Sequence, residues 1–158
     1  MQPIVNKIHS LLIKKRKTLA TAESCTGGLL SKLLTDLPGS SKYFLLGLVT
    51  YGINAKEYVL KIPGKLIKTK GAVSKEVALQ MARKVRNAAK ADFGIGITGI
   101  AGPSGGTVQK PVGTVFIAVS SRDKKICQGF NFTGNRTIIR KKAALKALEL
   151  LYAGIHRD

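Results

Sequence analysis

Strand-like apolar runs alternate along this chain with longer segments that carry the hydrophobic spacing of amphipathic helices. The runs cover residues 18–23, 43–51, 93–98, 113–120 and 125–132. The helical segments cover residues 3–16, 26–37, 54–60, a short stretch from Pro63, 74–91 and 136–152. Helices that alternate with strands pack on the faces of a sheet, so this order predicts a layered α/β fold. The last two runs are joined by the short turn Ser121–Lys124, which makes the expected sheet mixed rather than purely parallel.

Local signals set the expected ends of several elements. Ser74 and Asn135 have side chains typical of helix N-caps, and Asn54 is a third candidate. Pro38-Gly39 is a helix stop. The run 43–51 is continuously apolar, which predicts a buried strand.

Composition limits the class of protein. The chain has 158 residues, which fits one domain over residues 1–158 with a single apolar core. It is 44% hydrophobic and contains no Trp, so the core must be aliphatic. No apolar run approaches the roughly 20 residues that span a bilayer, and the N-terminus lacks the pattern of a secretion signal. We therefore expect a cytoplasmic protein that does not enter a membrane.

Cysteine and histidine are scarce. Cys25 and Cys127 are the two cysteines, and the two histidines, His9 and His156, lie near the ends of the chain. This number and spacing match neither a disulfide framework nor a zinc site. We therefore expect no Cys/His zinc site.

The net charge of +19 is extreme and is compatible with three kinds of partner: nucleic acid, an acidic membrane surface or an anionic small substrate. The alternative is that lysines simply cover solvated faces. They are spread along the chain, and the densest group, Lys14–Lys17, ends the first expected helix. Aromatic residues are not interleaved with them, so a base-stacking surface is not indicated.

Residues Thr98–Val112 form a glycine-rich connection between two strand-like runs. Glycine permits close approach and positive φ, and consecutive amides in such turns bind anions. Lys110 and the hydroxyls of Thr98, Ser104 and Thr107 add hydrogen-bond donors. The connection therefore predicts a loop that binds phosphate or ribose, and the alternative is a long hairpin connection.

Ser24 follows the first expected strand and precedes the next helix, within Ala22-Glu-Ser-Cys-Thr-Gly-Gly28. A serine at that place can act as a nucleophile while amides of the helix start stabilise an oxyanion. The alternative is that Ser24 or Thr26 only caps the helix. Cys25 is a competing nucleophile or a buried structural cysteine.

A nucleophilic serine needs a base, and neither histidine lies in a motif. Lys56, with Tyr51, follows the run 43–51, and a desolvated lysine near other cations has a lowered pKa. The alternative is that Lys56 is an ordinary solvated lysine on the surface. Arg136 and Arg140 lie one turn apart at the start of the last helix, either as a phosphate grip or as a charged face. Glu23 is a candidate to orient a lysine, bind a ribose or pair with a cation.

Six segments together resemble the C-terminal domain of the competence/damage-inducible CinA family, which includes stand-alone nicotinamide-mononucleotide amidohydrolases of the PncC type. The resemblance covers about residues 5–152. The matching segments are Ala22–Gly28, Thr50-Tyr51 with Ala55-Lys56, Gly71–Ser74, Ile97–Pro103 with Gly105-Gly106, Lys110–Thr114 and Gly134–Arg136.

The resemblance implies a three-layer α/β/α sandwich that hydrolyses the carboxamide of nicotinamide mononucleotide to nicotinate mononucleotide and ammonia, a step of pyridine nucleotide salvage. It implies that Ser24 is the nucleophile, Lys56 its base and Tyr51 a neighbour. The residues expected to hold the anionic nucleotide are Thr26, Gly27, Gly28, Thr98, Gly99, Ala101, Gly102, Gly105, Gly106, Thr107, Arg136 and Arg140. The resemblance also implies an enzyme that uses no metal, and no cofactor is expected. A compact enzyme of this kind is expected to form a homodimer.

The chain departs from the family pattern at two points. Gly52-Ile53-Asn54 stands where the family usually has a Ser-Asn-Glu-like triplet, which bears on how Lys56 is held. The 158 residues do not include the larger N-terminal domain that full-length members carry. Two rivals to the amidohydrolase stand. The change at residues 52–54 motivates a non-catalytic nucleotide-binding module, and the charge motivates a nucleic-acid-binding protein tied to competence or repair.

Overall fold

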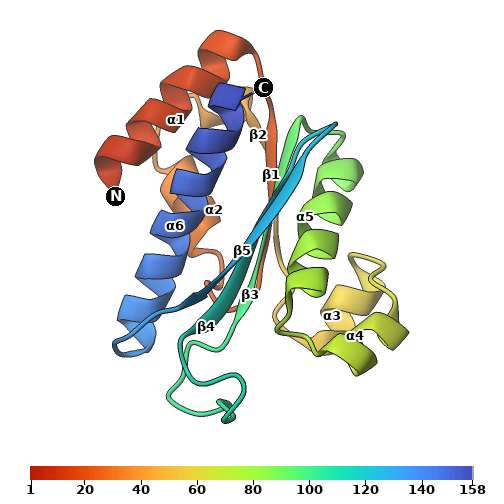
Figure 1. The fold of residues 1–158 in the computed structure, drawn as a ribbon. Helices are drawn as coiled ribbons and strands as arrows, with labels where there is room; N and C mark the ends of the chain where they lie inside the picture. The colour runs from red at the N-terminus through yellow and green to blue at the C-terminus, as the bar shows by residue number, and fades with distance from the viewer. Residues whose placement is uncertain (158) are drawn as a thin grey trace.

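Five strands form one mixed sheet with helices on both faces (Figure 1). The computed structural model describes residues 1–157. The helices are α1 (Gln2–Lys15), α2 (Leu29–Thr35), α3 (Ile53–Tyr58), α4 (Gly64–Lys70), α5 (Lys75–Ala89) and α6 (Arg136–Arg157), with a 3-10 turn η1 (Ser40–Lys42). The strands are β1 (Leu19–Glu23), β2 (Phe44–Val49), β3 (Phe93–Gly99), β4 (Thr114–Ser120) and β5 (Lys125–Asn131). The predicted three-layer α/β/α sandwich is confirmed.

The sheet has the order β2-β1-β3-β4-β5. Strand β1 pairs in parallel with β2 on one side and with β3 on the other. The pairs β3–β4 and β4–β5 are antiparallel, so the sheet is mixed as predicted. The carboxyl ends of β1, β2 and β3 therefore meet at one edge of the sheet.

Apolar side chains fill the space on both faces of the sheet. In Figure 1, α1, α2 and α6 lie on one side of the sheet and α3, α4 and α5 on the other. The larger cluster lies under α1, α2 and α6 and includes Ile8, Leu34 and Leu148, all fully buried. The second lies under α4 and α5 and includes Ile67 and Met81. The core is largely aliphatic, as the composition predicted, and no helix within residues 1–157 is long and apolar enough to cross a bilayer.

Most predicted element ends are confirmed within one or two residues. The Val77 amide donates to Ser74 Oγ at 3.3 Å and the Ile138 amide donates to Asn135 Oδ1 at 3.0 Å, so both predicted N-caps exist. Asn54 is not a cap, because α3 begins at Ile53. The second helix begins at Leu29 rather than at residue 26, because Gly27 and Gly28 have φ of 59° and 89° and form a turn before it.

Strand β2 differs from its prediction. The apolar run 43–51 predicted a buried strand, but β2 lies at the edge of the sheet and alternate residues are exposed. A continuous apolar run is equally compatible with both positions, so periodicity did not distinguish them.

Two glycines allow α5 to pack closely against β3. A Cβ on Gly96 would lie 2.4 Å from the Ala78 carbonyl oxygen, and a Cβ on Gly94 would lie 2.2 Å from that of Ala82. The atoms in the way belong to the helix backbone, which cannot turn aside as a side chain can. The small residues of strand and helix therefore set the distance between these two layers.

We expect Gly96→Ala to destabilise the fold by about 1–3 kcal/mol or more, because α5 must move away from β3 to admit the methyl group. Gly154→Ala is the matched control, since a Cβ there meets only Val119 Cγ1 at 3.8 Å. It replaces a helical glycine and should be neutral or stabilising by up to ~1 kcal/mol. Urea denaturation of the two variants measures the difference, and equal stabilities would contradict this account of the packing.

Candidate active site

Three chain segments meet at the carboxyl edge of the parallel strands. They are the turn Ser24–Gly28 after β1, the segment Thr50–Gly52 between β2 and α3, and the loop that follows β3. The Ser24 amide donates to the Ile97 carbonyl at 3.0 Å, and the Thr50 amide donates to the Glu23 carbonyl at 2.8 Å. These bonds extend the parallel pairing past the strand ends and fix the three segments relative to each other.

Ser24 and Lys56 are in direct contact. Lys56 Nζ lies 3.0 Å from Ser24 Oγ, and it donates to the Thr50 carbonyl at 2.7 Å and to the Tyr51 carbonyl at 3.2 Å. The two side chains are 7% and 2% exposed. The solvated alternative for Lys56 is therefore excluded, and the capping alternative for Ser24 fails because α2 begins five residues further on, at Leu29, with Gly28 as its N-cap.

Burial lowers the pKa of Lys56 from its ordinary 10.5 to about 8. We expected neighbouring cations to lower this pKa, but removal of the amine from water is the main cause and no cation contributes. No carboxylate within residues 1–157 bonds to Lys56, whose partners are backbone carbonyls and Ser24. The loss of an acidic residue at Gly52-Ile53-Asn54 therefore leaves Lys56 firmly held.

Glu23 has a structural role that its sequence position did not reveal. Its carboxylate is fully buried and accepts the amides of Leu30 and Ser31, at 3.1 and 2.7 Å, and the Ser31 hydroxyl at 2.6 Å. It therefore satisfies orphan donors of the first turn of α2. Glu23 does not bond to Lys56, and its buried carboxylate is taken up by these three donors.

Arg140 fixes the turn that carries the nucleophile. Its Nε and Nη2 both donate to the Thr26 carbonyl, at 3.2 and 2.7 Å. A Cβ on Gly27 would lie 3.2 Å from Arg140 Nη2, so the guanidinium lies directly against the turn. Arg140 is thus occupied by the backbone, and it does not line the cavity described below.

Arg136 reaches across the site instead. It donates through Nη1 to the Gly102 carbonyl at 2.8 Å and through Nη2 to the Tyr51 hydroxyl at 2.7 Å. It thereby links the start of α6, the glycine-rich loop and the segment after β2. Tyr51 is 56% exposed, so this link lies at the surface of the molecule.

A cavity of about 190 Å³ opens beside Ser24 and Lys56. Its walls come from all three segments and from the α4–α5 connection. The lining residues are Ser24, Cys25, Tyr51, Ile53, Lys56, Ala72, Val73, Thr98, Gly99, Ala101 and Arg136. A nucleophile–amine pair, backbone amides and one arginine therefore face a common space.

The glycine-rich loop contributes only its first part to this space. Thr98, Gly99 and Ala101 line the cavity, and Gly102 holds Arg136 through its carbonyl. Gly105, Gly106 and Thr107 lie outside it at the exposed tip, where the Thr107 and Lys110 backbones bond to each other. These three residues were predicted to bind substrate, but the structure does not place them in the cavity wall.

Two other predicted donors are used inside the protein. The Thr98 hydroxyl donates to the Ala72 carbonyl at 2.8 Å. Lys110 Nζ donates to the carbonyls of Lys70 and Val73, at 3.1 and 2.7 Å. These three bonds tie the end of β3 and the loop after it to the end of α4 and the α4–α5 connection, so they hold the cavity wall in place.

Thr26, Gly27 and Gly28 form the nucleophile turn without lining the cavity. The Gly27 amide donates to the Ser24 carbonyl at 3.0 Å and is not available to a ligand. The Ala101 amide, in contrast, has no acceptor within residues 1–157 although Ala101 is buried and lines the cavity. An amide without a protein acceptor, in a residue that lines the cavity, is a candidate donor to a developing oxyanion.

Three lining residues were missed in the sequence: Ile53, Ala72 and Val73. Ala72 and Val73 belong to a segment that carried the family resemblance but offered no polar side chain, so residue chemistry gave no reason to select it. Ile53 is 52% exposed and lies in the triplet that departs from the family pattern.

Cys25 is less suited than Ser24 to act as the nucleophile. Burial raises the pKa of its thiol to about 12, so the reactive thiolate is disfavoured. The structure supports the interpretation of Cys25 as a buried structural residue.

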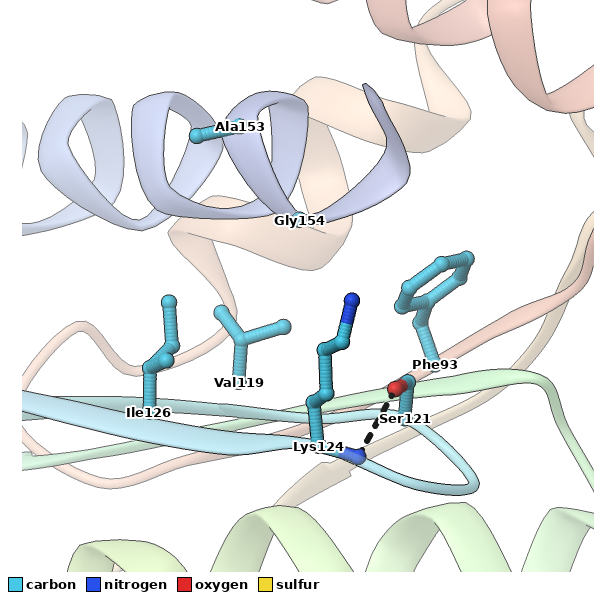
Figure 2. A pocket seen from close by; sticks show the side chains of 7 residues that line it. All are labelled: Phe93, Val119, Ser121, Lys124, Ile126, Ala153 and Gly154. Carbon is cyan, nitrogen blue, oxygen red and sulfur yellow. Dashed lines mark hydrogen bonds between the residues drawn. The ribbon is translucent and has the colours of Figure 1, made fainter. Parts of the chain in front are cut away.

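A second pocket lies far from this chemistry, between the end of α6 and the β4–β5 hairpin (Figure 2). It measures about 60 Å³. Its lining is Phe93, Val119, Ser121, Lys124, Ile126, Ala153 and Gly154. Its mostly apolar wall is part of the packing of α6 on the sheet. Over residues 1–157, no group of three or more His, Cys, Asp or Glu side chains lies close enough to hold a metal ion.

The CinA C-terminal domain family matches residues 1–155. A putative competence-damage inducible protein of Caldanaerobacter subterraneus subsp. tengcongensis is 49% identical over 151 residues, which is 96% of this chain and 36% of the relative. A CinA-like protein of Geobacter sulfurreducens is 50% identical over 144 residues, 91% of this chain and 35% of the relative. The chain thus spans about a third of the length of these curated relatives.

Solved structures of similar proteins have the same fold. The crystal structure of the competence/damage inducible protein CihA from Agrobacterium tumefaciens superimposes with a TM-score of 0.94 at 38% identity. The match covers 96% of this chain and 93% of that protein.

Proposed function

Because the chain belongs to the family of CinA C-terminal domains, we propose that its Ser24–Lys56 pair hydrolyses the carboxamide of nicotinamide mononucleotide, giving nicotinate mononucleotide and ammonia. The observation that carries the proposal is the 3.0 Å contact between a buried serine hydroxyl and a buried lysine amine whose pKa is lowered. A serine and a neutral amine at this distance form the minimal machinery for acyl transfer without a histidine.

The carbonyls around Lys56 set the direction of proton transfer. A neutral amine has two N–H bonds and one lone pair, and the carbonyls of Thr50 and Tyr51 accept the two N–H bonds. The lone pair is then left for the Ser24 hydroxyl, which donates its proton as Oγ attacks.

The reaction has two halves. Ser24 Oγ bonds to the amide carbon while its proton passes to Lys56 Nζ. The C–N bond of the tetrahedral intermediate breaks, and Lys56 returns the proton to the leaving nitrogen, which departs as ammonia. Water then attacks the acyl ester as Lys56 takes its proton, the bond to Oγ breaks, and the proton returns to Ser24. The Ala101 amide is the candidate donor to the oxyanion in both halves.

The cavity fits the reacting end of this substrate. At about 190 Å³ it is smaller than the typical 300–1,000 Å³ of a pocket for a drug-sized ligand, so only the pyridine carboxamide enters it. The ribose and phosphate then lie outside, toward Arg136 at the mouth. Arg136 exchanges the Tyr51 hydroxyl for the phosphate, which as an anion is the stronger acceptor.

The first prediction concerns the nucleophile. We expect Ser24→Ala to lower the rate of ammonia release from nicotinamide mononucleotide on the order of 10⁴-fold or more. Ser104→Ala, which removes an exposed hydroxyl of the glycine-rich loop, is the matched control and should retain full activity. A coupled ammonia assay with an enzyme-free blank measures both.

Equal rates in wild type and Ser24→Ala would remove Ser24 as the nucleophile. Calorimetric binding of the nucleotide without any turnover by wild type would favour a non-catalytic binding module. Turnover of free nicotinamide alone would remove the reason for a phosphate site.

The second prediction is a pH dependence. Lys56 acts as a base only when neutral, and a pKa of about 8 leaves it mostly protonated at pH 7. We therefore expect kcat/KM to rise with pH, by roughly tenfold between pH 7 and the plateau above pH 8, because that parameter reports the free enzyme. A profile that is flat or falls between pH 7 and 9 would contradict this role for Lys56.

The third prediction separates the two arginines. Arg136→Ala should raise KM by roughly 10- to 100-fold, the loss of a charged hydrogen bond, with a smaller change in kcat. Arg140→Ala should mainly lower kcat, because it releases the turn that positions Ser24. Arg83→Ala on α5 is the control. The same pattern of KM and kcat in both variants would disprove the division of roles.

A further inference from the structure

A hollow opens at the end of the sheet opposite to the candidate active site. It measures about 380 Å³ and is lined by Arg86, Asn87, Lys90, Ala91, Asp92 and Arg122, and we call it the cationic hollow. These residues come from the end of α5, from its connection to β3 and from the β4–β5 turn. In Figure 1 these segments lie at the top of the sheet, and the glycine-rich loop lies at the bottom. Pockets for small ligands typically measure 300–1,000 Å³, so the hollow is large enough to hold one.

The pairing of β3 with β4 brings these segments together. Gly94, near the start of β3, lies opposite Ser120 at the end of β4, so the turn that carries Arg122 lies beside the α5–β3 connection. Strand β3 extends from this end of the sheet to Gly99, which lines the active-site cavity. A strand of this length spans about 20 Å, so the hollow and the active-site cavity are separate sites.

Cations line this hollow without a carboxylate bound to them. Arg86 lies in the last turn of α5, Lys90 is the C-cap of that helix, and Arg122 lies in the β4–β5 turn. Within residues 1–157, none of the three forms an ion pair. Asp123 follows Arg122 in the turn, but it is exposed and does not line the hollow. Clefts lined by charge of one sign concentrate ligands of the opposite sign, so the hollow attracts an anion.

The carboxylate of Asp92, which also lines the hollow, is bound from the other side. It accepts the Thr18 amide at 2.8 Å and the Thr18 hydroxyl at 2.9 Å, and Lys17 Nζ lies 3.4 Å from it. Lys17 itself does not line the hollow. Its charge offsets that of Asp92, so the cations of the lining are left in excess.

Arg86 is held in place and has donors left over. It packs against β3, since a Cβ on Gly94 would lie 2.6 Å from Arg86 Cβ. Its Nη2 donates to Asn87 Oδ1 at 3.0 Å, and its buried Nε has no acceptor within residues 1–157. Buried donors are nearly always paired in folded proteins, so this guanidinium has unused hydrogen-bonding capacity beside the hollow. The NH₂ group of Asn87 is a further donor, because Oδ1 is the atom that accepts from Arg86.

We propose that the cationic hollow is a second anion site, which binds a small ligand with two or more linked phosphate groups. Charged donors of this kind form strong hydrogen bonds to phosphate oxygens. A single phosphate monoester carries about −1.5 to −2 charges at pH 7, which is less than the positive charge of Arg86, Lys90 and Arg122 together. The described lining residues include no aromatic ring, so the hollow recognises the phosphates rather than a base. The inference is independent of the proposed reaction, because it concerns a separate site.

The shape of the site favours a small ligand over nucleic acid. A protein that binds a duplex through its backbone presents cations in a stripe along one face, because the phosphates are spread along the helix. Here the cations from α5 and from the β4–β5 turn surround one concave space. A short oligophosphate fits this space, whereas a duplex would contact only its rim.

Calorimetric titration with pyrophosphate tests the proposal. The protein carries Arg136→Ala throughout, which removes the arginine of the active site as a competing ligand of phosphate. We expect one pyrophosphate to bind per chain, and Arg86→Gln/Arg122→Gln to weaken binding by roughly 100-fold, about tenfold for each charged hydrogen bond lost. The matched control Lys65→Gln/Lys68→Gln removes two exposed lysines of α4. It should change the affinity by less than about threefold, because distant surface charges are screened.

Arg122→Gln alone is the second variant, because Arg122 lies in an exposed turn and its loss leaves the packing of Arg86 on β3 intact. It should weaken pyrophosphate binding roughly tenfold, with an unchanged circular dichroism spectrum. The proposal is wrong if the Arg136→Ala protein does not bind pyrophosphate or if Arg122→Gln binds it unchanged. An equal loss of affinity in the lysine control would also overturn it, since binding would then follow the overall charge.

Two further measurements locate the ligand and identify its source. Amide chemical shifts of residues 86–92 and 121–123 should move when pyrophosphate is added, and those of Ser24–Gly28 should not. Shifts confined to Ser24–Gly28 would place the anion in the active site and overturn the proposal. A short DNA duplex is the second probe. If the duplex binds through Arg86 and Arg122 while pyrophosphate does not bind, the small-ligand site is disproved and this surface binds nucleic acid instead.

Discussion

An amine held out of water is the interaction on which the site depends. Lys56 is 2% exposed, and removal of an ammonium group from water has a high free-energy cost unless an opposite charge compensates. Its hydrogen-bond partners are two backbone carbonyls and a serine hydroxyl, all neutral. The charged form is therefore only partly stabilised, and the pKa falls to about 8. A carboxylate in the same place would stabilise the ammonium form and weaken Lys56 as a base.

The order of the strands brings this amine to Ser24. Strand β1 lies between β2 and β3. The connection from β1 to β2 runs through α2 on one face of the sheet, and the connection from β2 to β3 runs through α3, α4 and α5 on the other face (Figure 1). Ligand sites in open α/β sheets form at the carboxyl ends of the strands where such a change of direction occurs. Ser24 follows the central strand, and Lys56 reaches it from the short helix after β2. Glu23 bonds to the start of α2 and Arg140 to the Thr26 carbonyl, so both fix the turn between β1 and α2.

The sequence predicted most of the elements because these depend on local signals. The pairing of Ser24 with Lys56 came from the family resemblance, since local signals left a helix cap and a solvated lysine as alternatives. Ser74 and Asn135 are caps in the structure, and Ser24 and Lys56 lie in segments whose order along the chain matched a family. The edge position of β2 was not predictable, because an apolar run does not reveal its neighbours in the sheet. The different roles of Arg136 and Arg140 depend on which backbone carbonyl each side chain bonds to, and these carbonyls lie far away in the sequence. Helical spacing placed them on one face but could not separate them.

The large positive charge is a separate matter from the chemistry. Charges on the solvated surface are screened over about 8–10 Å at physiological ionic strength, whereas removal of Lys56 from water acts at the site itself. This difference explains why burial rather than neighbouring cations dominates the lowered pKa.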